Sequence, residues 1–525
     1  MAALSNGNQA SSSFNTPSIK FTKLFINGQF VHSLSGKEFE TIDPRTEEVI
    51  AKIAEGGKED IDVAVKAARV AFDHGPWPRM PGAERARIMM KWADLIEQNI
   101  DEIAALEALD AGKLYHFCKA VDIPSAANTI RYYAGAADKI HGEVLKASRE
   151  LHAYTLLEPI GVVGHIIPWN FPTTMFVAKV SPSLAAGCTM VLKPAEKTPL
   201  SALFYGHLAK QIGGSNSLPM VLVGVNPPGS FAISSHMDID KVSFTGSTEV
   251  GREVMRAAAN SNLKPVSLEL GGKSPVIVFD DADGYKAAAP VLMGILFNKG
   301  EMCVADTSVW VQEVFYDEVE RKLAEKANAW VVGDPFDPQV QHWPQVDGKQ
   351  FEKILSYIEH GNKVGAILLL GGIRSSFRGG YIEPTLFCNV KEGMLVAPDE
   401  PPPPGGSLPP AGGVGDATQF AGWGGFFLGG GMVVGFFFFF FFTPPPVFFF
   451  FFFLRFFFFF GGFFFFGGPP LSFFFFFFFF AALFFFLYFF FLPFFFFFVF
   501  FFFFFFLKKK RTFFFQRGGK FKTKI

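Results

Sequence analysis

Two residues in the middle of the chain carry side chains suited to covalent chemistry. Cys303 lies in the segment NKGEMCVA (298–305), and Glu269 lies in LELGGK (268–273), beside two glycines. A thiolate can act as a nucleophile, and a carboxylate can act as a general base. The alternatives are a small buried thiol and a surface glutamate, and spacing alone favours them because cysteine is commonly a core residue.

Three further short motifs contain polar residues and glycines that could bind a ligand. They are PWNFP (168–172), KPAE (193–196) and GSTEVG (246–251). A glycine turn that opens a helix presents backbone N–H groups to a phosphate. A plain tight turn explains GSTEVG equally well, and Asn170 in PWNFP could simply cap a turn. No GxGxxG motif with an acidic residue about 20 positions later occurs, so a standard Rossmann fingerprint is absent.

The elements that must position these motifs alternate between strands and helices. Thr198-Pro199 is an N-cap and first-turn pair that opens a predicted helix through Ile212. Apolar strands alternating with helices predict a parallel sheet covered on both faces, and such sheets bind ligands at the carboxyl ends of their strands. The predicted strands are 162–169, 189–194, 219–224, 241–247 and 275–281. The motifs follow several of these strands, so the sequence predicts an α/β fold with its site at that edge.

An amphipathic helix is predicted upstream of these strands. Its apolar residues recur at helical spacing, and the pattern closes at Asp110-Ala-Gly112. The apolar positions are Ile88, Trp92, Leu95, Ile96, Ile100 and Ile103.

The first 400 residues have the composition of a soluble enzyme. They hold 38 basic and 47 acidic residues, a net charge of −9, which argues against a nucleic-acid-binding surface. The four cysteines and ten histidines fit no zinc-like spacing, so we expect reduced thiols and no metal. Residues 1–20 lack the features of a signal or transit peptide, and we expect a disordered lead-in and a cytosolic protein.

Residues 401–525 have a different composition. They contain 55 of the 74 Phe, and Phe, Gly, Pro and Lys together make up 91 of these 125 residues. These four residues are the ones encoded by triplets of a single repeated base, and membrane spans mix more residue types than this. We interpret this segment as an artefact of homopolymer nucleotide reads. The alternative is a real membrane anchor, and resequencing the transcript distinguishes the two.

Taken together, the motifs resemble those of the NAD(P)-dependent aldehyde dehydrogenase superfamily. PWNFP, KPAE, FTGSTEVG, LELGGK and KGEMCVA occur in the family's order and spacing, and the resemblance runs from about Phe21 to Glu400. KLFINGQFV, IDPRTEEVI and GDPFD are also similar to the family. KGEMCVA and QFEKILSYIEHG (350–361) resemble cytosolic plant members that oxidise aromatic and aliphatic aldehydes.

The resemblance implies a role for each matching residue. Cys303 matches the nucleophile, which forms a thiohemiacetal and then a thioester, and Glu269 matches the general base. Asn170 matches the residue whose amide stabilises the oxyanion together with the Cys303 N–H. The resemblance favours NAD over NADP as the cofactor, because a carboxylate at position 196 suits a free ribose diol and repels a 2′-phosphate. The matching cofactor contacts are Trp169, Lys193, Glu196, Gly246, Ser247, Val250, Gly251, Gln350 and Glu400.

The resemblance also implies a domain organisation. Residues 21–140 and 160–270 correspond to a doubly wound NAD-binding domain, and residues 271–400 to an α/β catalytic domain whose C-terminal part is missing. Residues 141–159 correspond to a small β arm through which members of the family form homo-oligomers, here expected to be homotetramers. The substrate is a small aldehyde, and no nucleic acid or membrane partner is expected unless the Phe segment is real. A hydroxycinnamaldehyde is favoured over acetaldehyde by resemblance alone.

Some positions depart from the family pattern. Asn226 stands where the family has glycine. The stretch from Asp306 to Trp310 replaces a small/Arg stretch after the nucleophile, and His342-Trp343-Pro344 replaces the family's Gly-Pro. The missing C-terminal part of the catalytic domain and the Phe-rich segment leave two alternatives open at this point. One is a catalytically dead protein that keeps only the nucleotide-binding fold, and the other is a membrane-anchored enzyme.

Overall fold

The computed structural model describes residues 17–146, 149–212, 218–222, 227–375, 377–388 and 390. The N-terminal residues 1–16, Asn226, Glu400 and the segment 401–525 lie outside the described residues, and so do the predictions made for them. No helix among the described residues is long and apolar enough to cross a bilayer.

The largest sheet has seven strands in the order β11-β10-β7-β8-β9-β1-β2. The five strands from β11 to β9 are parallel, and β1 and β2 add an antiparallel hairpin at one edge. Asn27 and Gly28 form its turn with φ of 51° and 71°, which suits a two-residue hairpin loop. The strands are β1 Leu24–Ile26, β2 Gln29–Val31, β7 Val162–Ile166, β8 Thr189–Lys193, β9 Met220–Leu222, β10 Lys241–Gly246 and β11 Val266–Leu270.

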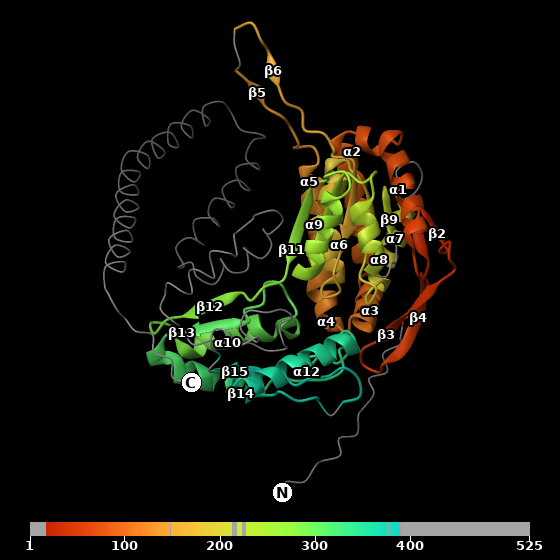
Figure 1. Cartoon of the computed structure of the whole chain (residues 1–525). Coiled ribbons are helices and arrows are strands. Elements are labelled where there is room, and N and C mark those ends of the chain that lie inside the picture. The colour runs from red at the N-terminus through yellow and green to blue at the C-terminus, as the bar shows by residue number, and fades with distance from the viewer. Residues whose placement is uncertain are drawn as a thin grey trace, which may run out of the picture. The chain divides into compact units, whose positions relative to one another are not determined.

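Helices cover both faces of this sheet (Figure 1). Successive side chains of β8 point to opposite faces of the sheet and enter two different cores. Met190 and Leu192 pack into one hydrophobic core, and Val191 packs into the other. The first core includes α2 Gly82–Gln98, α3 Ile100–Asp110, α5 Ile123–Ala136, α6 Pro172–Ala186 and α7 Leu200–Gln211. The second core includes α1 Lys58–Asp73, α8 Pro227–Ser235 and α9 Thr248–Ala259.

The predicted doubly wound α/β fold is confirmed by this strand order. The chain builds β7, β8 and β9 outward in one direction, then returns to place β10 and β11 on the other side of β7. The order therefore reverses between β7 and β10, and the carboxyl ends of these two strands flank the switch point where such sheets bind ligands.

The helix predicted across 88–103 is two helices. Asn99, with φ −112° and ψ 23°, separates α2 from α3, and its side-chain amide donates to the Leu95 carbonyl at 2.7 Å. The local bond competes with the helical backbone pattern, as Asn side chains commonly do. The predicted end of the helical region is correct, since α3 ends at Asp110 and Gly112 has φ +68°.

The segment from 275 to 390 forms further strands and helices. The strand predicted at 275–281 is β12, which pairs in parallel with β13, while β14 and β15 are antiparallel. Their bounds are β12 Pro275–Val278, β13 Ser308–Val311, β14 Ile367–Leu370 and β15 Leu386–Cys388. The helices are α10 Gly284–Leu296, α11 Tyr316–Asn328 and α12 Gly348–Lys363. Short helical turns span Trp77–Arg79, Tyr115–Phe117, Cys118–Asp122, Phe297–Gly300 and Glu313–Phe315.

The predicted small β arm corresponds to an antiparallel pair, β5 Val144–Leu145 and β6 Ala153–Tyr154. In Figure 1 this orange hairpin extends beyond the neighbouring helices. It carries exposed apolar side chains, among them Val144, Leu151 and Leu156. Its role in oligomerisation stays a prediction.

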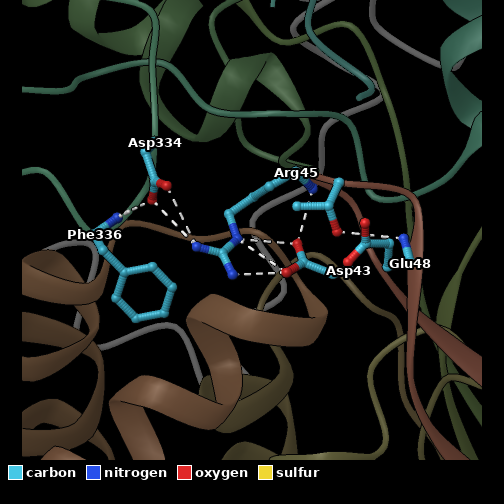
Figure 2. A network of polar contacts seen from close by, with 6 residues as sticks. Asp43, Arg45, Glu48, Asp334 and Phe336 are labelled. Carbon is cyan, nitrogen blue, oxygen red and sulfur yellow. Dashed lines mark hydrogen bonds and ion pairs between the residues drawn. The ribbon is translucent and has the colours of Figure 1, made fainter. Parts of the chain in front are cut away.

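Arg45 joins the hairpin of β3 Glu38–Asp43 and β4 Glu48–Ala54 to the segment around Asp334 (Figure 2). The guanidinium pairs with buried Asp43 at 2.7 Å and reaches Asp334 at 3.4 Å. It also lies 4.7 Å from the ring centroid of Phe336, within cation–π range.

Replacing Arg45 by methionine is expected to lower the free energy of unfolding by about 2–3 kcal/mol, because Asp43 would stay buried without its counter-charge. Urea unfolding followed by circular dichroism measures this. Arg378→Met is the control, since Arg378 forms an exposed pair with Glu48 at 3.5 Å. That change should stay within about 1 kcal/mol. Equal effects of the two substitutions would show that the Arg45 contacts do not stabilise the fold.

Candidate active site

Four of the predicted site residues lie at the switch point of the sheet. Trp169 and Asn170 follow β7, while Gly246 ends the neighbouring parallel strand β10 and Ser247 follows it. The pairing of Ile166 with Phe244 brings the two strand ends to the same edge. Strand topology therefore brings together residues that are more than seventy positions apart in the sequence.

The start of α9 has the features of a phosphate-binding turn. Ser247 caps the helix, and its hydroxyl accepts a hydrogen bond from the Val250 N–H at 3.3 Å. Val250 is exposed, whereas Gly251 is buried against β11. A Cβ at position 251 would lie 2.7 Å from a Leu270 methyl, so glycine lets the helix pack closely on the strand. The helix dipole and first-turn N–H groups suit a negatively charged ligand.

Lys193 and Glu196 form a pair at the carboxyl end of β8. The ammonium lies 3.2 Å from the Glu196 carboxylate, and Lys193 is buried while Glu196 is half-buried. Burial alone would raise the pKa of Glu196, but the Lys193 ammonium, the hydrogen bonds to the carboxylate and the Lys197 charge together hold that pKa below its usual value. An ionised carboxylate at this edge can accept hydrogen bonds from a diol.

Trp169 lies close to a second charged pair. The Lys197 ammonium is 5.6 Å from the Trp169 ring centroid and 2.6 Å from the Asp347 carboxylate. Asp347 caps α12 by accepting from the Gln350 N–H at 2.8 Å. These contacts link the strand-end loops after β7 and β8 to the first turn of α12.

The loop that carries Cys303 begins with an unusual turn. Asn298, Lys299 and Gly300 have φ of 49°, 61° and 74°, the left-handed region that non-glycine residues rarely adopt. Cys303 itself is exposed. Strained backbone of this kind is common at functional sites, where surrounding contacts hold it in place.

Asn170 contacts this loop directly. Its side-chain Nδ2 donates to the Glu301 carbonyl at 2.7 Å, and its Oδ1 accepts from the Phe171 N–H at 3.1 Å. Asn298 Nδ2 donates to the same Glu301 carbonyl at 3.1 Å. An amide group carries two N–H donors, so the Asn170 amide can bind the loop and present a second hydrogen toward a ligand.

Glu269 lies on β11, a strand that the sequence reading did not predict, and it is exposed. The neighbouring strand β10 places Thr245 opposite it. Burial lowers the pKa of the Lys179 ammonium to about 8, although the Glu269 carboxylate acts in the opposite direction. Glu269 therefore has an electrostatic partner in α6, the helix that begins two residues after Asn170.

Gln350 lies in the first turn of α12, and its Nε2 donates to the Glu301 carboxylate at 3.2 Å. The described part of the structure thus connects Asn170 and Gln350 through one residue of the Cys303 loop. Glu400, predicted beside Gln350, lies outside the described residues.

A buried charged set behind this site was missed by the sequence reading. Lys113 Nζ pairs with Asp122 at 2.6 Å, lies 3.8 Å from Glu107, and sits 3.9 Å from the Phe171 ring centroid. The Cys118 thiol and the carboxylates of Glu107 and Asp122 each place one potential metal-ligating atom within 4.8 Å of the other two. Burial raises the pKa of Glu107 to about 7. The Lys113 ammonium pairs with these carboxylates, so the cluster is charge-paired. Through the contact of Lys113 with the Phe171 ring, it packs against the segment that follows Asn170.

Comparison with known proteins agrees with this architecture. Residues 30–404 match the model of the aldehyde dehydrogenase family. The chain is 62% identical over 385 residues to aldehyde dehydrogenase family 2 member C4 of Arabidopsis thaliana, covering 73% of this chain and 77% of that protein. It is 52% identical over 383 residues to a mitochondrial benzaldehyde dehydrogenase of Antirrhinum majus, covering 73% and 72%. A solved NAD⁺ complex of an aldehyde dehydrogenase from Bacillus cereus superposes with a TM-score of 0.73 at 43% identity, covering 77% of this chain and 82% of that one.

Proposed function

The chain belongs to the aldehyde dehydrogenase family, and we propose that it oxidises aldehydes to carboxylic acids with NAD through Cys303, Asn170 and Glu269. The observation that carries the proposal is the hydrogen bond from Asn170 Nδ2 to the Glu301 carbonyl, two residues before Cys303. It brings the amide predicted to stabilise an oxyanion to the loop of the predicted nucleophile. The overall reaction is RCHO + NAD⁺ + H₂O giving RCOO⁻, NADH and two protons.

The residues at the switch point fit NAD. The first turn of α9, capped by Ser247 and preceded by Gly246, would hold the pyrophosphate. Lys193 and Glu196 would hold the adenosine ribose, and Trp169, Val250 and Gln350 would line the rest of the site, with Gly251 letting α9 approach β11. When bound, NAD⁺ supplies the two-electron oxidation of the substrate carbon.

Cys303 and Asn170 act in the first half of the reaction. The Cys303 thiolate adds to the aldehyde carbon and forms a thiohemiacetal, so negative charge develops on the former carbonyl oxygen. The Asn170 amide, together with the Cys303 N–H, stabilises that charge, and each such donor typically contributes about 10²–10³ in rate.

Glu269 acts in the second half. Oxidation leaves the acyl group on Cys303 as a thioester, which water must attack to release the acid. The Glu269 carboxylate removes a proton from that water, the C–S bond breaks, and the thiolate is regenerated. Its exposed position on β11 gives it access to solvent.

Cofactor selectivity gives a direct prediction for Glu196. Replacing it by alanine is expected to lower the preference for NAD over NADP, as the ratio of kcat/KM values, by about tenfold or more, because the repulsion of a 2′-phosphate is removed. Glu253→Ala is the control, since Glu253 lies exposed on α9 and pairs with Arg256. An unchanged ratio for the Glu196 variant would contradict the ribose assignment.

The proposed activity is tested by supplying NAD and an aldehyde to protein expressed from the natural transcript. We expect NADH and the carboxylic acid in equal amounts, with benzaldehyde and hydroxycinnamaldehydes favoured over acetaldehyde because of the likeness to the plant relatives. NAD binding without turnover of any of these aldehydes would instead support a protein that keeps only the nucleotide-binding fold. We further propose a cytosolic homotetramer whose exposed 141–159 hairpin lies at a subunit interface.

A further inference from the structure

Glu301 makes contacts with three separate segments of the chain. Its backbone carbonyl accepts hydrogen bonds from the side-chain amides of Asn170, at 2.7 Å, and Asn298, at 3.1 Å. Its carboxylate accepts from Gln350 Nε2 at 3.2 Å through one oxygen and lies 2.8 Å from Lys299 Nζ through the other. One residue thus joins the loop after β7, the turn before Cys303 and the first turn of α12.

The carboxylate and its partner ammonium are shielded from solvent. The side chains of Glu301 and Lys299 are each only 2% exposed. A buried ion pair of this kind holds its geometry because separating the charges, or removing one of them, leaves the other uncompensated. Screening by salt is also weak at such a depth.

Lys299 has a second anchor in the neighbouring segment. Its ammonium donates to the Pro344 carbonyl at 2.9 Å and lies 5.6 Å from the Trp343 ring centroid. The backbone of Lys299 has a φ of 61°, so a conformation unfavourable for lysine persists there. The ion pair and the Pro344 contact supply the tertiary restraint that keeps this turn in place.

These contacts point to a role for Glu301 that spacing and composition do not reveal. We propose that Glu301 is a positioning residue: its buried carboxylate, paired with Lys299 and held by Gln350, fixes the backbone carbonyl that aligns the Asn170 amide beside the Cys303 loop. The inference rests on the proposed function for the roles of Asn170 and Cys303. Glu301 itself touches no reacting atom in this role.

The test compares three variants of the full-length protein. Glu301→Gln keeps the shape but leaves the Lys299 ammonium buried without a counter-charge, and Lys299→Gln/Glu301→Gln removes both charges. Glu359→Gln is the matched control, because Glu359 lies on α12 like Gln350 but is exposed and forms a surface pair with Lys363 at 2.6 Å. Two readouts are used: steady-state kinetics, and hydrogen–deuterium exchange of the peptide spanning residues 298–305.

For Glu301→Gln we expect kcat to fall about 10- to 100-fold, with the KM for NAD changed by less than about threefold. An oxyanion donor is misaligned, while the residues proposed to hold the pyrophosphate and the adenosine ribose lie after β8 and β10. Exchange in 298–305 should accelerate. The double variant should recover at least about half of the loss on a logarithmic scale, because charge pairing couples the two residues. The Glu359 variant should match the unmodified protein in both readouts.

Unchanged kcat and unchanged exchange in the Glu301→Gln variant would overturn the proposal, as would equal losses in the single and double variants. If Glu301→Gln does not fold, Glu301→Asp replaces it, since the shorter side chain keeps the charge but cannot reach both Lys299 and Gln350. The exchange measurement needs no turnover. An unmodified protein that oxidises no aldehyde, but whose 298–305 peptide loosens on substitution, would therefore refute the proposed function and leave the positioning role supported.

Discussion

Replacing Cys303 by serine should abolish NADH formation from aldehydes, with a loss of at least about 10³-fold in kcat, because a neutral serine hydroxyl is a far weaker nucleophile than a thiolate. The substitution changes one atom on an exposed loop, so folding should be unaffected. NAD should still bind, since the residues proposed to hold it lie at the ends of β7, β8 and β10. Absorbance of NADH gives the rate, and quenching of tryptophan fluorescence gives the dissociation constant of NAD.

Cys388→Ser is the matched control for this change. Cys388 is buried in β15, and its thiol donates to the Ile367 carbonyl at 3.5 Å, a bond that a serine hydroxyl can replace. Burial raises the pKa of this thiol to about 11, so it is not a nucleophile at neutral pH. The control should keep more than about half of the activity, since the core contact is preserved. Normal turnover by the Cys303 variant would remove Cys303 from the mechanism.

Replacing Glu269 by glutamine should separate the two halves of the reaction. The first half does not need Glu269, so mixing the variant with NAD and aldehyde should yield a burst of one NADH per active site. Steady-state turnover should then fall about 10²- to 10⁴-fold, the usual contribution of a general base. Stopped-flow absorbance resolves the burst from the steady state.

Glu253→Gln serves as the control for this prediction, because it is the same chemical change at an exposed position on α9 outside its first turn. It should leave the steady-state rate within about threefold of the unmodified protein, as surface substitutions usually do. Unchanged turnover of the Glu269 variant would show that Glu269 is not the base of the second half. Loss of both the burst and the turnover would show that the first half needs Glu269 too, and would contradict its assignment to the second half alone.

Sequence reasoning located the switch-point residues because their positions depend on a local rule. Alternating apolar strands and helices predict a parallel sheet, and the residues that follow each strand must then lie at one edge. Asn170 and Ser247 both follow such strands, and the structure places them at the ends of neighbouring strands β7 and β10. Their assignment to particular roles came from the family resemblance.

The contacts of Glu301 could not be predicted in this way. Its partner Gln350 lies 49 positions away on α12, and the pairing depends on how that helix packs against the Cys303 loop. A charged residue in a polar, glycine-containing stretch is ordinarily read as exposed, yet Glu301 and Lys299 are buried as a pair. Tertiary packing, which the local pattern does not encode, decided both features.

Two local features were also read incompletely. The amphipathic pattern across 88–103 continues through Asn99, where a side-chain hydrogen bond to Leu95 divides the helix. Glu269 was identified as a candidate base, but its strand was not predicted, because Val266–Leu270 lies at the edge of the sheet and is only partly buried. A partly exposed edge strand lacks the continuous apolar run that marks the central strands.

The most direct test of the whole account is to trap the acyl group on the enzyme. Glu269→Gln protein is mixed with benzaldehyde and NAD, quenched with acid after the burst, digested and examined by mass spectrometry. We expect the peptide containing Cys303 to gain the mass of one benzoyl group, and hydroxylamine to remove that group as it does from a thioester. Formation of NADH without any acyl group on Cys303, or an acyl group on another residue, would contradict the proposed mechanism.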